Sequence, residues 1–150
     1  MRKISEHISF EEATKTNSKL KNEPDEAQYT AMVWVAEYFF EPLRKWWDNP
    51  ININSFFRSK EVNAEKGGAS TSQHVKGQAI DLSAQDKKDN AKLFKWIYDN
   101  LEYDQLIWEA GNDDYPDWIH GSLKPSGNRK QCLRMSIVKG KKVYTNYIPK

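Results

Sequence analysis

The sequence has a single cysteine, Cys132, among its 150 residues. One cysteine excludes an intramolecular disulfide, and it excludes a zinc site built from several cysteines. An excess of charge of one sign is also missing, because 23 lysines and arginines face 21 aspartates and glutamates, leaving a formal net charge of +2. So small a charge argues against a nucleic-acid partner, although it is compatible with an anionic polymer.

Long hydrophobic runs are absent, and none approaches the length that would span a membrane. We therefore expect no membrane partner. The N-terminal segment MRKISEHISFEEATKT begins with basic residues but has neither the apolar stretch nor the cleavage site of a secretory signal. This predicts synthesis in the cytoplasm, where the chain stays unless another factor releases it.

The residues that are present are typical of one folded domain spanning 1–150. Hydrophobic residues make up 38% of the chain and aromatic residues 13%, which suits a packed core. A chain of this length builds one core and is short for two. There is no internal repeat or long linker, and we expect a monomer.

Periodicity predicts a long helix early in the chain, beginning at Pro24 and Asp25 and ending at Pro50, with Pro42 inside it as a source of a kink. The segment 58–70 is predicted to be a loop. The remaining segments favour a helix over 87–101, strands over 51–57, 77–82, 103–109 and 117–123, and a hairpin over 133–148. Helices first and strands later, with short connections, predict an α+β fold with a mainly antiparallel sheet and helices packed against it.

Two segments carry the residues that suggest chemistry. The stretch STSQHVKGQAIDL places His74 and Asp81 in a run with few other charges, and PDWIHGSL supplies His120. In a chain with one cysteine, imidazole and carboxylate groups are the ligands left for Zn²⁺. Three protein ligands and one water form the open arrangement of a catalytic zinc site, and zinc lowers the pKa of bound water to about 7.

In order and spacing these motifs resemble those of the M15 zinc peptidases. This family includes D-Ala-D-Ala carboxypeptidases, vancomycin-resistance dipeptidases and phage L-Ala-D-Glu endolysins, and it shares a fold with the hedgehog signalling domain. The family pattern S-x-H-x-x-G-x-A-x-D matches residues 72–81, and its acid-x-x-H matches Asp117 and His120. The small phage and bacterial branch is the most similar, since SEH, R-S-x-x-x-N and G-G-x-x-x-S-Q-H occur here at 5–7, 58–63 and 67–74.

The resemblance implies that His74, Asp81 and His120 hold zinc and that Asp117 is the general base. Strand alternation would point Asp117 and His120 to opposite faces, so this role requires Pro116 to hold Asp117 outside the regular strand. Glu109 is a rival base, or a carboxylate that orients a metal ligand.

The resemblance also assigns residues to the substrate. Arg58 matches the family arginine that binds substrate and stabilises the oxyanion, Ser72 is expected at the rim of the site, and Trp118 is expected to line the cleft. His7 is expected to be structural. Relatives usually have valine where this chain has Gly121, which is expected to widen the site.

The implied function is zinc-dependent hydrolysis of peptidoglycan stem peptides, as a D-Ala-D-Ala carboxypeptidase or an L-Ala-D-Glu endopeptidase, in cell-wall degradation or remodelling. The missing export signal fits a phage endolysin that a holin releases. Two alternatives stay open: a hedgehog-like, zinc-containing binding module without turnover, and a cytoplasmic dipeptidase that trims recycled peptides.

Overall fold

A six-stranded sheet is the centre of the structure, a computed structural model that describes residues 2–150. The strand order is β3-β4-β6-β5-β7-β8, and every neighbouring pair is antiparallel except β5 with β7. The prediction of an α+β fold with a mainly antiparallel sheet is therefore confirmed. The strands are β3 (Ile51–Ser55), β4 (Ala79–Ala84), β5 (Gln105–Glu109), β6 (Trp118–Ser122), β7 (Gln131–Val138) and β8 (Lys141–Asn146).

The predicted long helix forms as three continuous segments, α2 (Glu26–Val35), a π-helical turn (Ala36–Phe40) and α3 (Glu41–Trp47). Asp25 caps its start, because the Asp25 side chain accepts a hydrogen bond from the Gln28 backbone N–H. Pro42 has no N–H to donate to the preceding turn, and the helix widens into the π turn just before it instead of ending. Within residues 2–150, no helix combines the length and apolar composition needed to cross a membrane.

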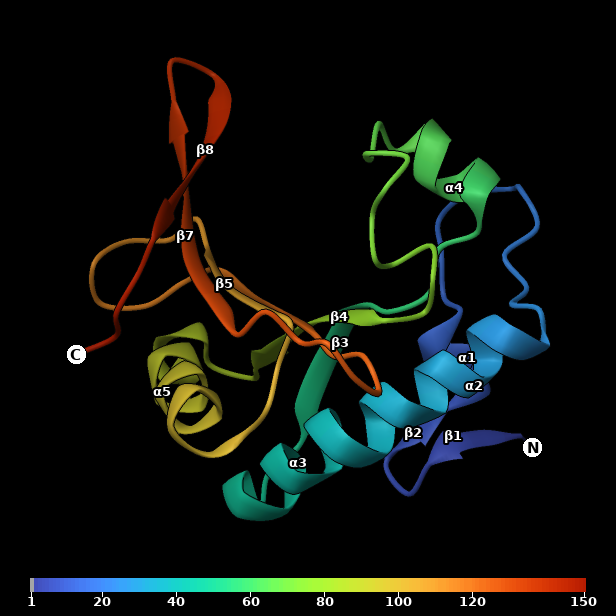
Figure 1. Cartoon of the computed structure of the whole chain (residues 1–150), viewed down its shortest axis with the longest axis horizontal. Coiled ribbons are helices and arrows are strands. Elements are labelled where there is room, and N and C mark those ends of the chain that lie inside the picture. Colours follow the sequence, from blue (N-terminus) through green and yellow to red (C-terminus); the bar gives the residue numbers. More distant parts are fainter. Residues whose placement is uncertain (1) are drawn as a thin grey trace.

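Helices α2, α3 and α5 (Asn90–Asn100) cover one face of the sheet, as Figure 1 shows. A short 3₁₀ turn (Lys87–Asp89) leads into α5. The main hydrophobic core lies between these helices and the sheet and includes Met32, Phe39, Leu82, Phe94 and Ile119. Inward-facing side chains of β4 and β6 therefore pack against helices, which leaves the alternate positions for the opposite face.

Gly121 belongs to this helix-covered face. A Cβ atom built on Gly121 would lie 2.2 Å from the Phe39 ring. The expectation that Gly121 widens the functional site is wrong, because in a strand it faces away from its neighbour His120. The missing side chain makes room for Phe39 in the core.

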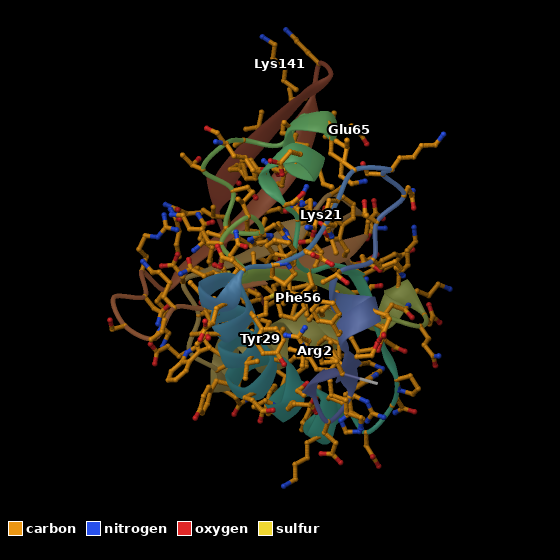
Figure 2. The ribbon with its side chains drawn as sticks, turned by 90° about the vertical axis from the view of Figure 1, so that its right-hand side faces the viewer. Arg2, Lys21, Tyr29, Phe56, Glu65 and Lys141 are labelled. Atoms are coloured by element: carbon orange, nitrogen blue, oxygen red, sulfur yellow. The ribbon has the colours of Figure 1, made fainter. Side chains whose placement is uncertain are left out.

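Several short elements appear where the sequence predicted none. Helix α4 (Lys60–Glu65) forms within the predicted loop 58–70, capped by the Ser59 side chain, which accepts from the Val62 N–H. Near the N-terminus lie β1 (Lys3–Ser5), β2 (Ile8–Ser9) and α1 (Phe10–Ala13). The Arg2 guanidinium, labelled in Figure 2, stacks on the Tyr29 ring at 4.5 Å and joins this segment to α2.

Within the described residues 2–150, no helical layer covers the centre of the opposite face of the sheet (Figure 1). Instead α4 and the β7–β8 hairpin rise from the same side of the sheet (Figure 1). Lys141 at the hairpin tip and Glu65 at the end of α4 both lie at the top of Figure 2. These two projections flank the strands that carry Asp81 and His120.

Candidate metal centre and active site

Asp81 and His120 face each other across neighbouring strands. They are register partners in the antiparallel β4–β6 pair, so their side chains lie on the same face of the sheet. His120 Nδ1 lies 3.1 Å from one oxygen of Asp81. His74, in the loop before β4, places its Nε2 3.3 Å from the other oxygen of Asp81. The structure therefore brings together the three residues predicted to bind metal.

A backbone hydrogen bond sets the orientation of His74. This side chain is nearly fully buried, and its Nδ1 lies 2.7 Å from the Phe56 carbonyl oxygen. A carbonyl only accepts, so Nδ1 carries the proton and donates. The lone pair on Nε2 is left on the Asp81 side. Histidines that bind metals commonly donate their second ring nitrogen in this way, which fixes the tautomer.

The three side chains fit a zinc ion. One ligand atom from each of His74, Asp81 and His120 lies within 4.8 Å of the other two. Burial opposes the charge of Asp81, but His74 and His120 more than offset it and hold its pKa well below the usual range. Asp81 is therefore a carboxylate. Two imidazole nitrogens and one carboxylate oxygen suit Zn²⁺ and leave its fourth position for water or substrate.

A cavity of about 900 Å³ opens over these ligands. Of the other residues predicted to act there, Arg58, Ser72, Glu109 and Trp118 all line it. The sequence did not indicate the far side of the cavity, which includes Gln131 and Leu133 of β7 and Lys142 and Tyr144 of β8. One sequence signal could have linked these two residues of β8. Side chains two residues apart in a strand share a face, so Lys142 and Tyr144 point the same way.

Arg58 reaches the cavity from the segment that follows β3. Its backbone N–H donates to the His74 carbonyl oxygen at 3.3 Å, which ties Arg58 to the loop that carries His74. The side-chain Nε is buried, and within residues 2–150 it has no hydrogen-bond partner. The guanidinium forms no ion pair with a described carboxylate. Arg58 therefore has donors available for a bound molecule.

Glu109 ends β5 on the same face as His120. Its register partner is Trp118, two residues before His120 on β6. Only 7% of Glu109 is exposed, and that part lines the cavity. Burial raises the pKa of Glu109 to about 7, although His120 and Lys142 act in the opposite direction. A carboxyl group that titrates near neutral pH and borders the metal ligands is suited to proton transfer.

Asp117 does not lie where the sequence motif led us to expect. It precedes β6, so it is outside the regular strand, as its predicted role required. Its carboxylate nevertheless lies 3.2 Å from Lys87 Nζ, its side chain is 40% exposed, and it is not among the residues that line the cavity. The Asp117 backbone N–H donates to the Glu109 carbonyl, and its own carbonyl accepts from Asn90. The structure therefore brings Glu109, and not Asp117, to the cavity.

The remaining candidate, His7, has a structural position. Its Nδ1 lies 2.6 Å from Glu41 of α3, and its backbone N–H donates to the same carboxylate. The Ser5 hydroxyl also donates to Glu41, so this carboxylate anchors the β1–β2 turn to the long helix. Although Glu6, His7 and Glu41 lie close together, they are on the surface, away from the cavity.

Comparisons with known proteins bear on which metal this site binds and on the family of the chain. A sequence model of the family described as Peptidase M15 matches residues 6–121, which include all three proposed metal ligands. A zinc D-Ala-D-Ala carboxypeptidase from Streptomyces albus G is 51% identical over 37 residues. That segment is 25% of this chain and 14% of the relative, so the chain spans only a small part of that protein.

The donor set, the family match and this relative agree in indicating Zn²⁺ as the metal of the site. Because the family model matches well over half of the residues, from the turn before β2 into β6, the chain belongs to the peptidase M15 family.

Proposed function

We propose that this protein hydrolyses peptide bonds in peptidoglycan stem peptides and takes part in cell-wall degradation or remodelling. One observation carries the proposal: His74, Asp81 and His120 converge at a cavity that Glu109 also lines, a carboxylate with no partner among the described residues. Metal ligands, a base and an open cleft are what hydrolysis of a peptide requires. The name of the Streptomyces albus G relative supports a cell-wall substrate.

His74 Nε2, His120 Nδ1 and Asp81 would hold the zinc ion. Bound there, Zn²⁺ supplies Lewis-acid polarisation and makes water acidic enough to lose a proton near pH 7. The hydrogen bond from His74 Nδ1 to Phe56 keeps one ligand fixed in tautomer and orientation. The register of β4 and β6 fixes the other two with respect to each other. The sheet thus preorganises the donor set before substrate binds.

Glu109 is the proposed general base and acid. It accepts a proton from the attacking water and returns it to the departing amine. No hydrogen bond or ion pair within residues 2–150 occupies its side chain, whereas Asp117 is paired with Lys87. A free carboxylate bordering the cavity is better placed for this transfer than a paired one outside it.

Arg58 is proposed to bind the carbonyl oxygen of the bond that is cut, on which negative charge develops. Its guanidinium is always charged and presents several donors, and its unpaired Nε is already desolvated. Ser72 at the rim supplies a hydroxyl for hydrogen bonding, and Trp118 supplies an apolar surface next to Glu109. An extended peptide would then lie across the open face of the sheet.

Mass spectrometry of purified muropeptides, incubated with the zinc-loaded protein with and without a chelator, tests this function. Loss of one terminal D-Ala would identify a carboxypeptidase, and a cut between L-Ala and D-Glu would identify an endopeptidase. Either cut should disappear with the chelator. Intact muropeptides after incubation with protein that contains zinc would contradict the proposal and favour a binding module.

A further inference from the structure

The side of the cavity farthest from Arg58 is a hairpin that the family match does not cover. The match ends at residue 121, whereas β7 and β8 span Gln131–Val138 and Lys141–Asn146. Lys142 and Tyr144 both line the cavity from β8. Family membership therefore assigns these two residues no role, although they border the proposed site.

The strand order places two cations on opposite sides of the metal ligands. Arg58 follows β3 at one edge of the sheet, and Lys142 lies on β8 at the other edge. Asp81 of β4, His120 of β6 and Glu109 of β5 lie between them in that order. Five spacings of about 4.8 Å separate the backbones of β3 and β8, roughly 24 Å in all, and the long side chains of Arg58 and Lys142 shorten the gap that a bound peptide must span.

Lys142 has no carboxylate partner within the described chain. Lys87, Lys95 and Lys124 form ion pairs, but no described acidic group lies within 4 Å of the Lys142 ammonium. Lys142 nevertheless lines the same cavity as Glu109 and the proposed metal ligands. A cation without a partner at the border of a binding cavity is suited to an anionic group of the bound molecule.

The same hairpin carries an apolar surface. Tyr144 is 47% exposed and Ile137 is 57% exposed, while Ile137 is the register partner of Lys142. Val138 and Val143 are also exposed, but strand alternation places them on the other face of the hairpin. On the face of Lys142, Tyr144 and Ile137 therefore offer exposed apolar surface to a bound molecule.

We propose that Lys142 and Tyr144 form a subsite for a substrate carboxylate, so that the β7–β8 hairpin selects anionic stem peptides. This inference rests on the proposed peptidase function. The Lys142 ammonium pairs with the carboxylate and the Tyr144 hydroxyl donates to it.

The test uses two synthetic stem peptides that differ at one group, the carboxylate of the D-Glu residue, which is either free or converted to a carboxamide. The zinc-loaded full chain should cleave the free form with a kcat/KM higher by about three- to tenfold, mainly through KM. Lys142→Met should remove this preference by slowing cleavage of the free form alone. Tyr144→Phe should remove part of it.

Lys141→Met is the matched control. It removes the same charge from the adjacent residue, which lies at the hairpin tip and does not line the cavity (Figure 2). This variant should keep the preference of the unmodified protein. Equal cleavage of both peptides by the unmodified protein, or equal effects of Lys141→Met and Lys142→Met, would overturn the subsite.

Affinities measured with the Glu109→Gln variant separate this proposal from the peptidase function. If neither peptide is cut but the free form binds more tightly and Lys142→Met abolishes the difference, the subsite stands and the hydrolytic function fails. If both are cut but bind equally, the function stands and the subsite fails. If neither peptide binds, the subsite is overturned.

Discussion

The two faces of the sheet use alternate residues of the same strands for opposite purposes. Toward the helices, Leu82, Ile119 and Trp108 are buried in the main core. On the other face, their neighbours Asp81, His120 and Glu109 border an open cavity. The closed face should respond to changes in volume, whereas the open face should respond to changes in charge and donor atoms.

The largest expected effect comes from removing a metal ligand on the open face. Asp81→Ala should abolish stoichiometric zinc binding and lower kcat/KM by about 10³-fold or more, because the metal provides several kcal/mol of transition-state stabilisation. Metal analysis of the purified variant and hydrolysis assays would check this. Full zinc content in Asp81→Ala would contradict the assignment of Asp81 as a ligand.

Arg58→Lys should have the next largest effect on activity. It keeps the charge but loses the forked donors, so kcat/KM should fall by about 10²-fold while zinc content is unchanged. Kinetic assays with zinc determination distinguish this from a loss of metal. Activity near that of the unmodified protein would show that Arg58 does not bind the reacting carbonyl.

On the closed face, Gly121→Val should destabilise the fold. The added Cβ would overlap the Phe39 ring, and overpacking of a core typically costs about 1–3 kcal/mol in the free energy of unfolding. Denaturant titration would measure the loss. Unchanged stability would mean that the long helix shifts easily, which would weaken the contrast between the two faces.

The last expected effect concerns Glu109 and pH in the metal-free protein. Burial raises the pKa of Glu109 from 4.5 to about 7, so between these values the folded state keeps a proton that the unfolded state releases. The unfolding free energy should therefore fall as pH rises from about 4.5 to 7. Glu109→Gln should remove this loss and stabilise the protein at pH 8 by no more than about 3 kcal/mol.

Denaturant titrations of both proteins at pH 4 and pH 8, each with a chelator, would measure this difference. The gain should be present at pH 8 and absent at pH 4. A gain of equal size at both values would trace the effect to packing and not to the charge of Glu109.

Local sequence signals predicted much of the fold and the cluster of His74, Asp81 and His120. The cap at Asp25, the strand alternation around Asp81 and His120, and the spacing from His74 to Asp81 are all local patterns. Two features depend on tertiary contacts and were missed. The role of Gly121 is to leave room for Phe39, which comes from a distant helix. The Asp117 side chain is paired with Lys87, which also comes from a distant segment.

Which carboxylate acts as the general base, Glu109 or Asp117, also depends on contacts between distant segments. The motif spacing from Asp117 to His120 favoured Asp117, but register across β5 and β6 places Glu109 on the face of His120. Likewise, the contribution of β8 to the cavity depends on how the hairpin projects from the sheet. Spacing along one strand carries no information about the neighbouring strand.

The most direct test compares Glu109→Gln with Asp117→Asn, both loaded with zinc, in kcat/KM for muropeptide cleavage. Each variant replaces a carboxylate by an amide of nearly the same shape. We expect Glu109→Gln to keep its zinc and lose about 10²- to 10⁴-fold in rate, while Asp117→Asn stays within about threefold of the unmodified protein. The reverse pattern would contradict Glu109 as the base and return that role to Asp117.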